Sequence, residues 1–277
     1  MTRSASRLRT ARVSAALLLS AAAVIGAVGT AAAAPVASAP VAAGHAGAQP
    51  ITGTSGPEAV LRSRQVTRRA LRAPTGSSTS FSFASLLDGK PVRWDPCTPI
   101  PWTSNTATAP VGGLTVLKAA VAQVAAQTGT TWTYVGETTT VPQQGYLPTS
   151  ARTAYAPVLL GWTTGASSDL LAGQASSVLA MTRHAWFGIQ RADGSQVAAI
   201  RAAVVAFDAT DRLPLTGPVS WSAVALHELG HVVGLGHTSD STQLLAPVLP
   251  RTVASLQAGD KTGLYRLGRS AGCVTVQ

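Results

Sequence analysis

The chain has 277 residues, 46% of them hydrophobic and 12% charged, and this composition excludes a polyampholytic disordered protein. Two cysteines are too few for a disulfide-rich scaffold or for a zinc module built from four cysteines. The formal net charge of +10 comes mainly from residues 1–80, which carry nine arginines and one acid, whereas residues 81–277 carry 12 bases and 10 acids. A nucleic-acid-binding surface would concentrate its bases on the folded domain, so we expect no nucleic-acid partner.

The N-terminal segment has the layout of a secretory signal peptide. Four arginines and no acid lie in the first 14 residues, an apolar run extends from Ala15 to Ala34, and Ala-x-Ala patterns follow up to Ala43. We therefore expect a signal peptide at 1–34, with cleavage between residues 31 and 43 and no stable membrane insertion afterwards. An uncleaved membrane anchor is the alternative, because the run approaches the length of a membrane span.

The next segment has the composition of a linker. Residues 35–80 are rich in Ala, Gly, Ser, Thr and Pro and contain no aromatic residue. The basic stretch 62–72 leaves a propeptide or a cell-wall contact open as alternatives. All 14 aromatic residues occur from Phe81 onwards, and a packed core needs large side chains, so we expect one folded domain at 81–277.

The two cysteines stand near the two ends of that domain. In an exported protein an isolated pair of cysteines is usually oxidised. We therefore expect Cys97 and Cys273 to form a disulfide that closes nearly the whole domain. Two free buried thiols are the alternative.

The remaining pattern alternates strands and helices and indicates an α+β domain. The expected segments in chain order are an extended stretch at 92–104, a helix at 114–127, strands at 131–136, 158–162 and 202–207, a loop at 208–218, a helix from Ser220 or Ser222, and a helix at 253–267.

The predicted helix after Ser220 contains a metal-binding pattern. His227 and His231 are four residues apart, so both imidazoles lie on one helix face and can share a cation. Neutral imidazoles suit zinc. Glu228 lies about 100° around the helix from His227. Its carboxylate can therefore reach a zinc-activated water as general base rather than bind the metal.

A third histidine fits the same site only if the chain bends. In a continued helix His237 would lie about 15 Å beyond His227 along the axis. We expect the helix to end near Gly234, because glycine adopts positive φ at a helix C-terminus without steric cost. Three histidine ligands leave one zinc position for water, which is typical of a catalytic site. Two alternatives stay open, namely histidines satisfied by hydrogen bonds alone and a zinc site that has lost its activity.

The stretch 227–237 resembles the zinc-binding signature of the metzincin metallopeptidases. The continuation is similar to the matrixins among them, in which a Ser-rich turn and a tight Met-turn follow the third histidine. Here those turns correspond to 238–240 and 243–247, with Leu245 and Pro247 in the second. Residues 204–208 resemble the strand before the active-site helix, and residues 257–264 resemble the start of the C-terminal helix. The segment 93–97, paired with Cys273, is similar to secreted matrixin-like proteins of the actinobacterial type.

Two positions depart from the matrixin pattern. Leu245 stands where the family has a methionine beneath the metal, and leucine is similar in volume and also apolar. Ala206 stands where the resemblance implies a histidine ligand of a second, structural zinc. His184 is the other histidine of the domain, and we interpret it as a lone surface or core residue. We therefore predict one zinc ion, and calcium is not indicated.

The resemblance implies a twisted mixed β-sheet packed on helices, with the active-site helix bordering a substrate cleft and a smaller C-terminal subdomain. It also implies a secreted zinc-dependent endopeptidase that acts on protein or peptide substrates, with Glu228 as general base. The substrate would lie along an edge strand, for which 178–182 is our candidate, and we expect a monomer. The alternative is a catalytically weak or inactive zinc-bearing protein, extracellular or bound to the cell wall.

Overall fold

The computed structural model describes residues 73–74, 78–148, 156–190 and 196–274. The predicted signal peptide and its cleavage window lie outside these residues, as does nearly all of the predicted linker. Within the described ranges, no helix combines the length and the apolar character needed to cross a membrane.

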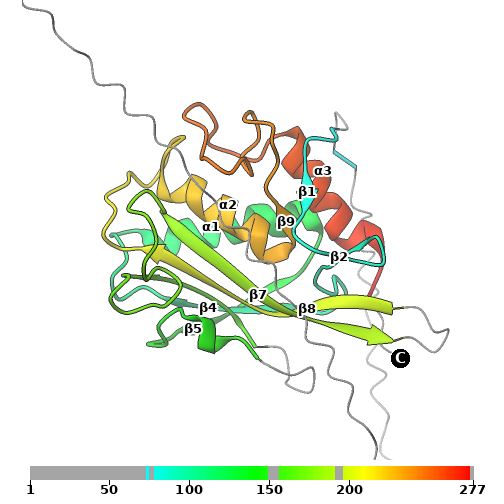
Figure 1. Cartoon of the computed structure of the whole chain (residues 1–277), viewed down its shortest axis with the longest axis horizontal. Helices are drawn as coiled ribbons and strands as arrows, with labels where there is room; N and C mark the ends of the chain where they lie inside the picture. Colours follow the sequence, from blue (N-terminus) through cyan, green and yellow to red (C-terminus); the bar gives the residue numbers. More distant parts are fainter. Residues whose placement is uncertain (1–72, 75–77, 149–155, 191–195, 275–277) are drawn as a thin grey trace, which may run out of the picture. The chain divides into compact units, whose positions relative to one another are not determined.

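A mixed five-stranded sheet forms the centre of the domain (Figure 1). Its strands lie in the order β5-β4-β6-β8-β7, and all neighbours run parallel except β7, which pairs antiparallel with β8 and forms one edge. The strands are β4 (Ile100–Asn105), β5 (Trp132–Glu137), β6 (Val158–Thr163), β7 (Ala180–Gln190) and β8 (Gln196–Asp208). The three strands that the sequence predicts are thus confirmed as β5, β6 and β8, and β8 begins earlier than expected.

Short elements complete the described part. They are the strands β1 (Ser82–Phe83), β2 (Leu86–Leu87), β3 (Lys90–Pro91) and β9 (Leu235–Gly236), and the 3-10 turns η1 (Gln144–Tyr146) and η2 (Arg269–Ala271). β1 pairs with β9 and β2 pairs with β3, both antiparallel.

The three α-helices of the described part are α1 (Gly113–Thr128), α2 (Trp221–Val233) and α3 (Ala258–Leu267). α1 begins and ends close to the predicted limits. α3 begins five residues after the predicted 253, because Gln257 and Asp260 form a capping box that fixes its first turn there. A mixed sheet with these helices is an α+β arrangement and confirms the predicted fold class.

Helices α1 and α2 pack on one face of the sheet and enclose the main core. Aromatic contacts fix α2 over the sheet: Trp162 stacks on Phe207 with ring centroids 4.8 Å apart and meets Trp221 of α2 edge-on at 5.6 Å. The opposite face carries a smaller apolar cluster formed by Leu159, Leu170, Leu171, Val204 and Ala206.

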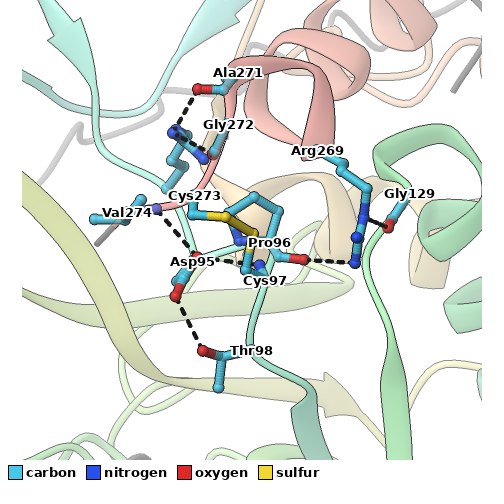
Figure 2. The surroundings of a disulfide bond; sticks show 11 residues. Asp95, Pro96, Cys97, Thr98, Gly129, Arg269, Ala271, Gly272, Cys273 and Val274 are labelled. Carbon is cyan, nitrogen blue, oxygen red and sulfur yellow. Dashed lines mark hydrogen bonds between the residues drawn. A yellow bond between two sulfur atoms is a disulfide. The ribbon is translucent and has the colours of Figure 1, made fainter. Parts of the chain in front are cut away.

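A disulfide joins Cys97 to Cys273, 176 residues apart, as the sequence predicts (Figure 2). The Oδ1 atom of Asp95 accepts hydrogen bonds from the backbone N–H of Cys97 and of Val274. Arg269 donates to the main-chain oxygens of Gly129 and Pro96. The C-terminal end of the described chain is therefore tied to the segment that leads into β4.

Candidate metal centre

Helix α2 carries three of the predicted site residues, and its ends are fixed locally. At the start, the Ser220 hydroxyl accepts from the N–H of Ala223 at 3.2 Å, so Ser220 rather than Ser222 is the N-cap. At the end, Gly234 has φ +112°, and a Cβ there would lie 2.6 Å from the main-chain oxygen of Val92. Only glycine fits both the backbone angle and the space. The helix therefore ends where the sequence predicts the bend.

The chain then folds back along β9 towards the same helix face. β9 is held by β1, whose Ser82 and Phe83 pair with Gly236 and Leu235. The Ser82 hydroxyl also donates to the main-chain oxygen of His237 at 2.5 Å. The return strand thus brings His237 to the two histidines of α2.

The three imidazoles meet at one point. The Nε2 atom of His231 lies 3.0 Å from that of His227 and 3.1 Å from that of His237, and His227 and His237 are 3.2 Å apart at the same atoms. Three nitrogens that bind one tetrahedral zinc at about 2 Å lie about 3.3 Å from one another. The spacing of the three rings therefore fits a single metal ion, and these residues could hold one.

The second ring nitrogens define which tautomers are present. Nδ1 of His227 lies 2.7 Å from the main-chain oxygen of Leu244, and Nδ1 of His231 lies 2.8 Å from that of Leu235. A carbonyl oxygen only accepts, so each Nδ1 carries the hydrogen, and in the neutral ring each Nε2 presents a lone pair. Two lone pairs 3.0 Å apart repel each other unless a cation lies between them. The donor set therefore fits zinc and not a network of hydrogen bonds alone.

Burial keeps these rings neutral. Removal from water, together with the neighbouring imidazoles, lowers the pKa of each of His227, His231 and His237 to about 4. Only neutral imidazole binds a metal, so all three rings are ready to bind at neutral pH.

Glu228 lies beside this cluster and is almost fully buried, with 7% of its surface exposed. Burial raises the pKa of its carboxyl group, and the electrostatic interaction with the His231 ring, the hydrogen bond from Thr182 and the charge of Arg183 offset only part of that rise. The Thr182 hydroxyl donates to Oε2 of Glu228 at 2.5 Å. A carboxylate whose pKa is raised in this way is a stronger base than a solvated one, as proton transfer from water requires.

The turn at 243–247 packs against α2 and supports the histidine cluster. Leu245 is buried and packs against Gly230 of α2, and the carbonyl of Leu244 orients His227. The carboxylate of Asp260, fully buried in α3, accepts from the N–H groups of Leu244 and Leu245 at 2.9 and 3.1 Å. Pro247 follows at the surface. This turn therefore links α3 to the histidines.

Two further predictions concern β7 and the far face of the sheet. The candidate edge 178–182 overlaps the start of β7, which does form an edge of the sheet. Ala206, in register with Met181 of β7, lies in the apolar cluster of the far face. His184 lies on β7 next to the backbone of His231, and burial lowers its pKa to about 4. It is thus a neighbour of the cluster and not an isolated surface residue.

Sequence reasoning missed three residues that touch the site, namely Ser82, Thr182 and Asp260. Asp260 lies in the stretch 257–264 that resembles the C-terminal helix of matrixins, and that match could have drawn attention to it. Ser82 stands in no motif, and Thr182 ends the candidate edge 178–182 without any sign of its contact with Glu228. Both reach the site only because β1 and β7 pack beside it.

Comparison with known families agrees with this geometry. Residues 131–267 match the family model described as matrixin, a family of metallopeptidases. The match covers β5 to α3 and so includes the three histidines, Glu228 and the supporting turn. A search of curated proteins found no match to the chain.

Proposed function

Because the chain belongs to the matrixin family through residues 131–267, we propose that it is a zinc-dependent endopeptidase that cleaves peptide bonds in protein or peptide substrates. The observation that carries this proposal is the meeting of three Nε2 atoms 3.0–3.2 Å apart, with an almost fully buried carboxylate next to them. The zinc would be held by His227, His231 and His237. When bound, it supplies a Lewis acid that makes water more acidic and stabilises negative charge on oxygen.

Residues of the chain supply proton transfer, positioning of the catalytic groups and a strand for the substrate. Glu228 takes a proton from the attacking water and passes it to the departing amine. Thr182 and the α2 backbone hold Glu228 in place, and the carbonyls of Leu244 and Leu235 orient two of the rings. β7 is an edge strand of the sheet in the described part of the chain, and it offers backbone groups with which an extended peptide can pair. Peptide hydrolysis needs these parts, and all of them lie within one contiguous region.

We place the working enzyme outside the cell. The signal-peptide pattern at 1–34 supports export, and the disulfide between Cys97 and Cys273 suits an oxidising compartment. Residues 35–80 would then be a linker, a propeptide or a contact with the cell wall.

The proposal is tested by measuring bound zinc and cleavage of an unstructured protein by the wild type and by Glu228→Ala. The wild type should bind one zinc per chain and cleave, whereas the variant should bind zinc equally and lose at least about 100-fold in rate. If both proteins bind zinc and neither cleaves, the chain is the inactive zinc-bearing protein instead. If the wild type binds no zinc, the metal centre itself is wrong.

A further inference from the structure

Thr182 joins the edge strand β7 to the middle of the active-site helix. Its Oγ1 lies 2.5 Å from Oε2 of Glu228 and 3.4 Å from the main-chain oxygen of the same residue. Thr182 is half-buried, and Glu228 is 7% exposed, so water does not compete freely for this contact. The two residues are 46 positions apart in the chain.

We propose that Thr182 is a positioning residue for the reaction. Its hydroxyl fixes Oε2 of Glu228, and Oε1 is thereby left as the oxygen that exchanges protons with the reacting water. This inference rests on the proposed function and deepens it, because it names the group that sets the geometry of the base.

The chemistry of the two groups defines the direction of the contact. An ionised carboxylate only accepts hydrogen bonds, so the single hydroxyl hydrogen of Thr182 points at Oε2. Hydrogen bonds to a charged acceptor are short and about twice as strong as neutral ones. A glutamate side chain has three rotatable bonds, and a fixed carboxylate avoids the entropic cost of ordering it at each turnover.

The neighbours of Thr182 show that β7 holds α2 at two points. Residues two apart on a strand share a face, so Thr182 and His184 both face the helix. Thr182 hydrogen-bonds Glu228, and His184 lies next to the backbone of His231. Arg183 between them directs its guanidinium to the carbonyl oxygen of Thr182 at 3.0 Å. The strand proposed to pair with substrate is therefore also the strand that orients the base, and it runs beside a proposed zinc ligand.

The test compares Thr182→Val, which removes the hydroxyl but keeps the shape, with Thr182→Ser, which keeps the hydroxyl. Thr103→Val is the matched control, because Thr103 of β4 donates to the main-chain oxygen of Gly136 at 2.7 Å and touches none of the proposed catalytic groups. For each protein we would measure kcat and KM on one peptide, zinc per chain, and urea unfolding of the metal-free form. The unfolding series is repeated in the Glu228→Ala background.

We expect Thr182→Val to lower kcat by about 10- to 100-fold, with KM changed less than about twofold and zinc content unchanged. Thr182→Ser should recover most of kcat, and Thr103→Val should keep it. In metal-free protein that keeps Glu228, Thr182→Val should raise the equilibrium constant for unfolding by about tenfold or more, because a stabilising hydrogen bond is lost. The increase should be clearly smaller in the Glu228→Ala background.

An active wild type whose Thr182→Val variant keeps its kcat overturns the role of Thr182 alone. A Thr182→Ser variant as slow as Thr182→Val, or equal stability effects in both backgrounds, does the same. A wild type that binds zinc but cleaves nothing overturns the proposed function, and the role of Thr182 falls with it.

Discussion

Leu245 lies directly against Gly230 of the active-site helix. A Cβ placed on Gly230 would lie 3.0 and 3.1 Å from the two terminal carbons of Leu245 and 3.3 Å from its Cγ. Because Gly230 has no side chain, the turn at 243–247 can approach α2 closely in the stretch between His227 and His231. Leu245 is buried in this contact, with 1% of its surface exposed.

The first prediction concerns Leu245, the residue that packs against Gly230. Leu245→Met should keep zinc content and change the free energy of unfolding by less than about 1.5 kcal/mol, because the two side chains are similar in volume. Leu245→Ala should cost about 2–5 kcal/mol, because it leaves a cavity against Gly230. Urea unfolding of the zinc-bound proteins measures both. A Leu245→Met variant that gains many-fold in cleavage rate would show that the leucine limits activity, contrary to this expectation.

The local parts of this site were predictable from the sequence, since they depend on spacing. Histidines four apart share a helix face, and a glycine three residues beyond the second one ends the helix, as Gly234 does with φ +112°. The strands and helices with strong periodicity were also placed within a few residues. The exact start of α3 was not, because it depends on a capping box that the apolar pattern does not reveal.

Contacts made by packing were not predictable. Thr182 lies 46 residues from Glu228, and Asp260 lies 16 residues from Leu244. Neither separation along the sequence matches the period of a helix or a strand. Each contact forms only because β7 and α3 pack beside the site in the folded domain. His184 looked like a lone histidine for the same reason, although it lies next to the backbone of His231.

The second prediction concerns the third proposed ligand. His237→Ala should weaken zinc affinity by about 100-fold or more, because two imidazoles then hold the ion that three hold in the wild type. Competition with a chromophoric chelator measures the affinity. Thr103→Val is again the control, since Thr103 contacts Gly136 and none of the three histidines, and it should keep zinc at a stoichiometry near one. Unchanged zinc affinity in His237→Ala would show that the chain does not return along β9 to bring His237 to the metal.

The third prediction tests the link from α3 to the turn. Asp260 is fully buried and accepts three backbone N–H groups, from Leu244, Leu245 and Gln257. Asp260→Asn replaces one acceptor oxygen with a donor, so it should lower the free energy of unfolding by about 1–3 kcal/mol and weaken zinc binding. The control is Asp169→Asn, an exposed carboxylate that accepts one backbone N–H, where the loss should stay below about 1 kcal/mol. Equal losses at both positions would mean that burial of Asp260 does not matter.

The fourth prediction concerns the disulfide. It closes a loop of 176 residues, so its removal in a Cys97→Ser, Cys273→Ser double variant should cost up to about 5 kcal/mol in the free energy of unfolding. Zinc stoichiometry should stay the same, because the histidine contacts with Leu244 and Leu235 do not involve the cysteines. Non-reducing peptide mapping of the wild type should find the linked pair. Free thiols in the exported protein would contradict the prediction.

The fifth prediction concerns the segment just before the predicted domain. The backbone N–H of Ser78 donates to the Thr262 hydroxyl of α3, and a Cβ on Gly259 would meet the main-chain oxygen of Ser80. Further along, β1 pairs with β9, and the N–H of Ala84 donates to the main-chain oxygen of Gly234 at 2.8 Å. Residues 78–84 therefore hold β9, the strand that leads directly into His237.

A chain that begins at residue 86 should consequently bind zinc about 10- to 100-fold more weakly than one that begins at residue 73, because the partners that orient His237 are lost. Ser82→Ala in the longer chain should show a smaller loss of the same kind, since β1 still pairs with β9. Zinc competition and thermal unfolding of the three proteins measure these effects. If residues 35–80 contain a propeptide, the mature N-terminus should lie before Ser78, and N-terminal sequencing of the exported protein would check this. A mature chain that begins beyond Ala84 and retains full zinc affinity would show that the β1–β9 pairing is dispensable for the site.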